Sequence, residues 1–220
     1  MKTNAAKKPQ AARKPRSQQR SDMGAEIRKL RKARKLTLQE LSEATGISLS
    51  YLSEIERGLT NPTVEAMEAI ASALRVDFSW FFPTRHGKGP LERTNIVRGG
   101  NRRNLNSLYG RSVDEIGYSD RLLSSSIGGS FYMGIATFEP DKSNNRPFVR
   151  YKTGTEHHGI VLQGELELTL EDEVITLSAG DSYSYDFSIR HRLRNMGEKP
   201  AVLVWAVSPI ELDVVTNETQ

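Results

Sequence analysis

Hydrophobic residues recur at helical spacing over residues 22–83. Leu52 and Ile55 lie three positions apart in one short run, and the run before it ends at Gly46. Spacings of three and four residues bring side chains to one face of a helix, and glycine often follows the last turn. The pattern predicts a set of short amphipathic helices that are stable only when packed together. The last of them has its predicted interior at Val64, Met67, Ile70, Ala71 and Leu74.

Over residues 106–212 the hydrophobic period becomes two. The segment ELELTL alternates leucines with polar residues, SYSY alternates as well, and AVLVWAV is a short apolar run. Such runs, separated by glycines and polar turns, are typical of short strands in an all-β barrel or sandwich. Between the two regions, residues 84–105 are rich in glycine and arginine and are interpreted as a linker. The chain is therefore predicted to be an α + β protein of two domains, with residues 213–220 as a flexible C-terminus.

Two consecutive helices in the first region begin with residues suited to cap them. Thr37 is followed three positions later by Glu40, as in a capping box, and Ser48 can cap the helix that contains Leu52. The segment ATGIS between these helices places Gly46 where a left-handed residue fits. Two short helices joined in this way form the helix-turn-helix geometry, in which the second helix lies in a major groove of DNA.

The outer side of that second helix is small and mildly polar. It offers Leu49, Ser50 and Ser53 to solvent. Serine hydroxyls can donate to or accept from base edges, and leucine can contact a thymine methyl group, so we expect this face to bind double-stranded DNA. Because a single recognition helix reads only a few base pairs, we also expect a homodimer on a palindromic operator.

The segment EIRKLRKARKLTLQELSEATGISLSYLSEIERGLTNPTVEAMEAIASALRV resembles the helix-turn-helix domain of the XRE family, the phage-repressor type of regulator. The resemblance implies a five-helix N-terminal domain and an ion pair between Arg31 and Glu56 that ties the first helix to the recognition helix. The family often carries glutamine where this chain has Leu38, and Gln39 follows one position later. The resemblance places the DNA contacts at Thr37, Gln39, Ser48, Leu49, Ser50, Ser53, Arg57 and Asn61.

Residues 1–21 carry seven lysines and arginines and no acidic residue. Their low complexity, without a hydrophobic period, predicts a disordered basic tail. Two interpretations remain open. The tail has no role beyond solubility, or it is an arm that neutralises phosphates or lies in a minor groove.

The segments YKTGTEHHGIVLQGELEL and LSAGDSYSYDFSIRHRLRNMG resemble the two consensus motifs of the cupin superfamily. The resemblance implies a double-stranded β-helix barrel over residues 106–212. In the first motif, His157 stands where the family usually has glutamate, and Thr153 and Tyr151 stand where it has two histidines. In the second motif, three residues fit the consensus: Gly180, His191 and Asn195.

The motif positions matter because a divalent metal in such a barrel needs three or four converging ligands. If the strands keep the phase of the motifs, His157 and His191 point into the barrel, and Glu156 and His158 point away. Two imidazoles without a carboxylate make a poor iron site, so we expect no cofactor. A divalent metal at these two histidines stays open, as does a pair of interior histidines that only hydrogen-bond nearby groups. We prefer a site for a small-molecule effector, formed by Tyr151, Thr153, His157, Tyr185 and His191, whose donors suit a carboxylate or an amide group.

Composition narrows the remaining choices. The 220-residue chain has no cysteine, which excludes disulfides and thiolate chemistry, and no apolar run long enough for a membrane span. We expect a cytoplasmic, non-enzymatic transcriptional regulator whose cupin domain senses a small molecule. The alternative is a non-haem metal-dependent oxygenase or epoxidase of the same helix-turn-helix plus cupin arrangement, with its ligand positions at Thr153, His157 and His191.

Overall fold

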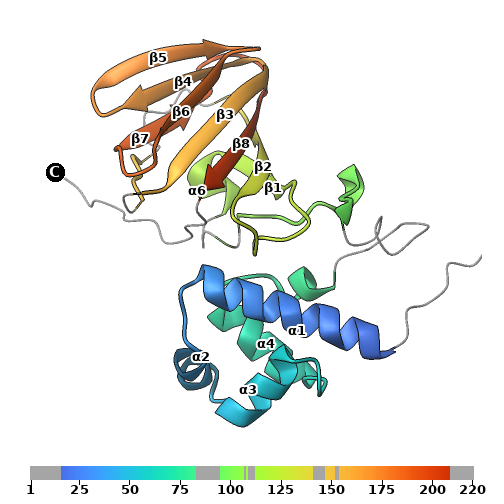
Figure 1. The fold of residues 1–220 in the computed structure, drawn as a ribbon. Coiled ribbons are helices and arrows are strands. Elements are labelled where there is room, and N and C mark those ends of the chain that lie inside the picture. Colours follow the sequence, from blue (N-terminus) through green and yellow to red (C-terminus); the bar gives the residue numbers. More distant parts are fainter. Residues whose placement is uncertain are drawn as a thin grey trace, which may run out of the picture.

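The chain folds into a helical N-terminal part and a C-terminal part made of two β-sheets (Figure 1). The structure is a computed structural model, and it describes residues 16–82, 95–106, 108, 112–140, 147–151 and 154–208. The predicted division into helices followed by strands is confirmed.

The described N-terminal residues form four α-helices, so the prediction of five is wrong. They are α1 (Arg16–Ala33), α2 (Leu38–Thr45), α3 (Leu49–Glu56) and α4 (Val64–Ala73). The aromatic segment after α4 makes only a four-residue 3-10 turn, η1 (Phe78–Phe81), because burying Trp80 and Phe81 against the helices requires no longer element. Residues 16–21, expected in the disordered tail, belong to α1, and residues 1–15 lie outside the described residues.

The caps predicted around the helix-turn-helix are confirmed. Thr37 Oγ1 accepts from the Glu40 backbone N–H at 3.1 Å, and the Thr37 N–H donates back to Glu40 Oε2 at 2.6 Å. Gly46 ends α2 in the left-handed conformation with φ 70°, and Ser48 Oγ accepts from the Tyr51 N–H. These local bonds fix the start of both helices and the turn between them.

The helical core follows the predicted spacing with one exception. Leu41, Leu52 and Ile55 are buried, as are most of the predicted interior positions of α4. Val64 is 60% exposed, which corrects the prediction that it lies inside. It is the first residue after the N-cap Thr63, at a position where the helix still points away from its neighbours.

The C-terminal part is a sandwich of antiparallel sheets with strand orders β1-β2-β8-β3-β6 and β5-β4-β7. Apolar side chains of both sheets fill the space between them, and a one-turn helix, α6 (Val113–Ile116), precedes the first strand. The predicted all-β architecture is confirmed. The strands are β1 (Tyr118–Leu122), β2 (Tyr132–Phe138), β3 (Glu156–Gln163), β4 (Glu165–Leu170), β5 (Glu173–Ser178), β6 (Ser182–Asp186), β7 (His191–Arg194) and β8 (Ala201–Ser208).

The second half of the predicted linker is part of the folded structure. After the short 3-10 helix η2 (Gly99–Asn101), Asn104 pairs with Arg121 in a β-bridge, and Leu105 is fully buried. Residues 83–94 lie outside the described residues. The segment just before residue 106 is therefore held against β1, which its glycine- and arginine-rich composition does not reveal.

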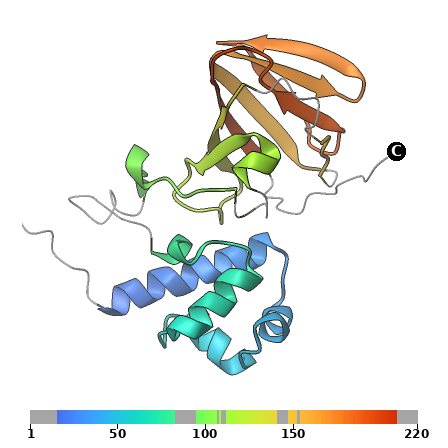
Figure 2. The same cartoon turned by 180° about the vertical axis from the view of Figure 1, so that it is seen from behind.

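Side chains from the helices bind this anchored segment directly. Arg103 donates to Glu26 Oε1 at 2.7 Å and lies over the Trp80 ring at 5.0 Å. Arg34 donates to the carbonyl oxygens of Leu74 and Leu108. Both views show α1 facing the sheets and α3 on the far side of the helical domain (Figures 1 and 2). The helices and the sheets therefore meet through α1.

Among the described helices, none has the length and apolar character that a membrane span requires.

The close approach of α1 to α3 yields the first prediction. A Cβ at Gly24 would lie 2.1 Å from the Ile55 carbonyl oxygen, although alanine normally stabilises a helix interior by about 0.5–1 kcal/mol relative to glycine. We expect Gly24→Ala to lower the free energy of unfolding by about 1–3 kcal/mol, because backbone must move to relieve the clash. Chemical denaturation measures this, with Gly100→Ala as control because nothing lies within 4 Å of its Cβ position. A Gly24→Ala protein at least as stable as the wild type would contradict the packing.

Candidate functional site

The exposed face of α3 is the first candidate site. Leu49 is 44% exposed, Ser50 is exposed and Ser53 is half-buried, while Leu52 on the opposite side is fully buried. The helix α3 lies on the side of the helical part that is away from the sheets (Figures 1 and 2). The described part of the chain therefore leaves it open to a ligand as large as DNA.

An ion pair fixes α3 against α1. Arg31 Nε and Nη2 donate to the two carboxylate oxygens of Glu56 at 2.6 and 2.9 Å, and Arg31 Nη1 donates to the Leu36 carbonyl at 2.7 Å. The hydrogen bond to Glu56 raises the pKa of the Arg31 guanidinium above its ordinary value. The pair is largely buried and bidentate, a geometry that holds its partners at a defined distance and angle. The ion pair implied by the sequence resemblance is thus present.

Of the other predicted DNA-binding residues, some lie exposed on the surface and some cap helices. Gln39 Nε2 donates to Glu43 Oε1 at 2.8 Å on the surface of α2. Arg57 is exposed at the end of α3, where its Nε donates to the Ser53 carbonyl. Asn61 is exposed, and its carbonyl accepts from the Tyr51 hydroxyl. The hydroxyls of the remaining two, Thr37 and Ser48, are engaged in the helix caps described above.

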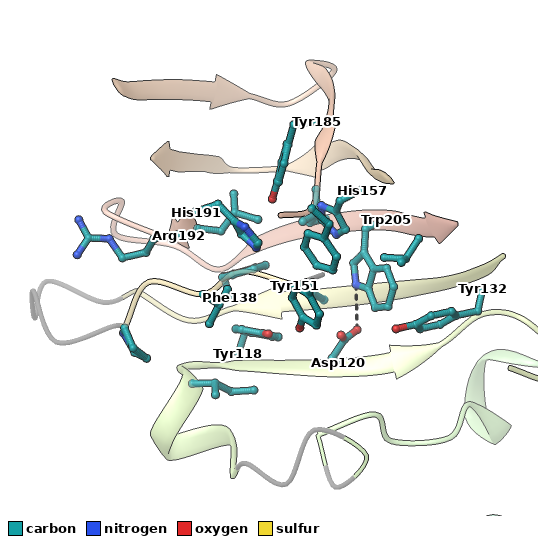
Figure 3. Close-up of a pocket in the computed structure, with 18 residues that line it drawn as sticks. Tyr118, Asp120, Tyr132, Phe138, Tyr151, His157, Tyr185, His191, Arg192 and Trp205 are labelled. Carbon is teal, nitrogen blue, oxygen red and sulfur yellow. Dashed lines mark hydrogen bonds between the residues drawn. The ribbon is translucent and has the colours of Figure 1, made fainter. Parts of the chain in front are cut away.

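A cavity between the two sheets is the second candidate site (Figure 3). Its volume is about 110 Å³. Four of the five predicted ligand-binding residues line it, namely Tyr151, His157, Tyr185 and His191. The fifth, Thr153, lies outside the described residues. Residues at the cupin motif positions therefore lie around one cavity in the structure.

Strand alternation places the two histidines inside. His157 is buried in β3, while its neighbours Glu156 and His158 are exposed and hydrogen-bond each other at 3.3 Å. His191 is buried at the start of β7. Their ring centroids are 6.4 Å apart, and both rings stack on Phe187, at 4.5 and 4.8 Å.

The polar atoms of the cavity are only partly satisfied. His191 Nδ1 lies 2.8 Å from the Ile189 carbonyl, so this nitrogen carries the proton. His157 Nδ1 and Tyr185 Oη are buried and have no hydrogen-bond partner. The two histidines therefore make no hydrogen bond to Tyr185 or to each other.

Burial keeps these groups uncharged. It lowers the pKa of His157 well below its ordinary value, with a smaller contribution from the nearby His191, and it lowers the pKa of His191 to about 4. It also raises the pKa of the Tyr185 hydroxyl well above its ordinary value. At neutral pH the imidazoles and the phenol are therefore all neutral.

The residues present do not fit a cupin metal centre. Among the described residues, no three histidine or carboxylate side chains come together in a way that could hold a metal ion. Asp120 also lines the cavity, but its Oδ1 accepts from Trp205 Nε1 at 3.1 Å, and burial raises the pKa of its carboxyl well above the ordinary value. A carboxyl whose charged form is disfavoured by burial and that is already bound to an indole is a poor ligand for a divalent cation.

Sequence reasoning missed several residues of this cavity. Asp120 and Tyr118 come from β1, whose inward positions alternate in YSDRL and were available to a period-two search. Trp205 lies in the apolar run that was assigned to β8, and Phe187 follows β6. None of these residues occupies a cupin motif position.

Known families match both parts of the chain. The helix-turn-helix family matches residues 27–81, and the cupin domain family matches residues 137–207. The chain joins an XRE-type helix-turn-helix domain to a cupin domain. The HTH-type transcriptional regulator SutR of Escherichia coli is 27% identical over 177 residues, which is 79% of this chain and 86% of SutR. The immunity repressor protein of Bacillus phage phi105 is 44% identical over 57 residues, 26% of this chain and 40% of the repressor.

These relatives support a helix-turn-helix transcriptional regulator with a cupin domain, in agreement with the expectation of a non-enzyme. Two solved structures match most of the chain at low similarity. An HTH_3 family transcriptional regulator from Vibrio cholerae is 20% identical with a TM-score of 0.37, over 88% of this chain and 98% of that one. Hydroxypropylphosphonic acid epoxidase from S. wedmorenis is 18% identical with a TM-score of 0.42, over 86% and 97%. Scores this low do not decide between a regulator and an enzyme.

The buried histidines predict how stability depends on pH. Because the pKa of His191 is about 4 in the folded chain and about 6.5 when unfolded, the unfolded state binds more protons across this window. Stability therefore falls as the pH falls from 6.5 towards 4. We expect the wild type to lose about 2 kcal/mol more unfolding free energy than His191→Asn between pH 7 and pH 5.

Chemical denaturation at the two pH values measures this difference, and His158→Asn, on the exposed side of β3, is the control. If the wild type and His191→Asn lose the same amount of stability, the imidazole of His191 is not held neutral by burial.

Proposed function

We propose that the chain is a sequence-specific DNA-binding transcriptional regulator of the cytoplasm, whose cupin domain binds a small-molecule effector. The observation that supports DNA binding most directly is the small, exposed face of α3, held in place by the Arg31–Glu56 pair. Helices of this kind enter the major groove, where Ser50 and Ser53 can bond base edges and Leu49 can contact a thymine methyl group.

One such helix contacts only a few base pairs and binds DNA too weakly by itself, so we propose that the chain binds its operator as a homodimer. Two recognition helices that enter successive major grooves must lie about 34 Å apart, which requires a palindromic operator. Arg57 and Asn61 lie exposed beside the recognition helix and are the proposed phosphate contacts. Residues 1–15, which are basic, would add affinity that depends on salt and not on sequence.

Effector binding is supported by the cavity between the sheets. A buried polar atom without a partner costs about 1–3 kcal/mol, and both His157 Nδ1 and Tyr185 Oη are in this state. A molecule that bonds these atoms would recover part of that free energy. The described residues of the cavity therefore offer polar atoms to a ligand but no three converging metal ligands, and for this reason we prefer effector binding to the oxygenase alternative.

A chain of hydrogen bonds leads from this cavity towards the helices. Tyr118 and Asp120 of β1 line the cavity. The Asp120 N–H donates to Asn106 Oδ1 at 2.9 Å, Asn106 Nδ2 donates to the Tyr118 carbonyl at 3.0 Å, and the Leu105 N–H donates to the Asp120 carbonyl at 2.9 Å. A shift of β1 on effector binding would therefore move residues 105–106.

The same segment reaches the recognition helix through α1. Arg103, whose carbonyl accepts from the Leu122 N–H of β1, is paired with Glu26 of α1. Arg31, further along α1, is paired with Glu56 of α3. We therefore assign to this route the coupling between effector and operator, which needs only about 1–3 kcal/mol to change occupancy several-fold.

Replacing the serines of α3 tests the DNA-binding proposal. We expect the double variant Ser50→Ala, Ser53→Ala to bind its selected operator roughly tenfold more weakly and to bind unrelated DNA as before, because only base contacts are lost. The operator is first selected from random DNA with the wild type, and affinities are then measured by fluorescence anisotropy. Ser72→Ala, an exposed serine of α4, is the matched control.

A second variant separates base contacts from phosphate contacts. Arg57→Gln is expected to weaken binding to operator and unrelated DNA alike and to reduce the salt slope of log K by about one.

Unchanged operator affinity and sequence preference in the double serine variant would show that α3 does not recognise the sequence.

A further inference from the structure

Four of the aromatic rings that line the cupin cavity are almost parallel, whereas the Tyr185 ring is inclined to that of His157 by 56°. The Tyr151 and Phe187 rings stack at 3.9 Å with an angle of 10° between their planes. His157 makes an angle of 6° with Phe187, and His191 makes one of 21°. Four rings from separate segments therefore share nearly one orientation, and a flat molecule can lie against them with favourable stacking.

Two buried polar atoms define where such a molecule would be bound. His157 and Tyr185 have exposed fractions of 6% and 8%, and their ring centroids are 5.5 Å apart. His157 Nδ1 and Tyr185 Oη both lack a partner, and Figure 3 shows both side chains among the residues that line the cavity. A ligand group with a donor and an acceptor close together, such as an amide, can satisfy both atoms.

The charges around the cavity disfavour an anion. Of the described residues that line it, Arg192 is the only lysine or arginine. In Figure 3 the Arg192 guanidinium points away from the ring cluster, and it lies over the Phe148 ring at 4.4 Å. Burial holds the pKa of both histidines low, so neither supplies a positive charge at neutral pH. A carboxylate inside would be buried without a cation, which is costly.

Volume sets the size of the occupant. The cavity measures about 110 Å³. An engineered apolar cavity of about 150 Å³ in another protein holds benzene, so the smaller space here limits the occupant to at most a single ring, and a polar group on that ring requires small shifts of the lining side chains. A larger metabolite would have to displace the stacked rings or reach beyond the described walls.

We propose that the effector of the cupin domain is a small, uncharged, planar molecule, a single aromatic or heteroaromatic ring whose amide or hydroxyl group pairs with Tyr185 Oη and His157 Nδ1. The proposal rests on the effector-binding part of the proposed function, and it selects the amide from the two groups, carboxylate and amide, that the sequence left open. The low pKa of both histidines and the outward position of Arg192 disfavour the carboxylate.

Three probes of nearly the same shape test the proposal. Benzamide is neutral, benzoate is an anion and benzamidine is a cation at pH 7.5. Isothermal titration of the full chain should show benzamide binding at least tenfold more tightly than either charged probe. Tyr185→Phe should weaken benzamide at least fivefold without loss of stability, because the hydroxyl that it removes has no partner in the fold. His158→Asn, with its exposed side chain, should leave the affinity unchanged.

Benzoate binding as tight as benzamide, no binding of benzamide at millimolar concentration, or an unaltered affinity in Tyr185→Phe would each overturn the proposed ligand class. Operator binding by the same preparation is measured separately by anisotropy. A chain that binds its operator but not benzamide refutes the ligand class and leaves the regulator proposal intact. A chain that binds benzamide but no DNA sequence selectively refutes the regulator proposal and leaves the ligand class intact.

Discussion

The arrangement of the two domains depends on the hydrogen bonds that the Glu26 carboxylate accepts. This side chain of α1 is only 4% exposed, and it accepts from Arg103 Nη1 at 2.7 Å and from Trp80 Nε1 at 3.3 Å. A buried charge needs such partners, and removing one of them typically costs 3–5 kcal/mol. Three separate segments, namely α1, η1 and the segment that leads into β1, are thus held together at one point.

That constraint gives the two candidate sites a physical connection. Arg103 and Glu26 join the segment beside the cavity to α1, and Arg31 and Glu56 join α1 to the recognition helix. Both links are bonds between charged groups with little exposure, so a displacement at one end is transmitted more rigidly than through loops. Coupling between effector and operator then requires no large rearrangement, only a change in which orientation of α1 the occupied cavity favours.

Features that depend on residues close together in the sequence could be predicted, and features that depend on contacts between distant segments could not. The caps at Thr37 and Ser48, the left-handed Gly46 and the inward phase of His157 arise from spacings of a few residues, and all are confirmed. The Arg31–Glu56 pair was found through family resemblance. Local spacing could not reveal that Leu105 anchors the segment before β1, or that Asp120 lies beside Trp205, because strand pairing decides both. The same limit applies to the predicted fifth helix. The structure has only η1 at this place, where Trp80 packs against distant segments.

Coupling through Glu26 and Arg103 is tested most directly by the effect of benzamide on operator affinity. The comparison is between the wild type and the double variant Glu26→Gln, Arg103→Met, which removes the ion pair without leaving a buried charge unpaired. The account predicts that saturating benzamide changes the operator Kd of the wild type by about fivefold or more, and that this factor falls towards one in the double variant while benzamide affinity in the absence of DNA is retained. An equal factor in both proteins would show that the signal, if it passes between the domains at all, takes another route.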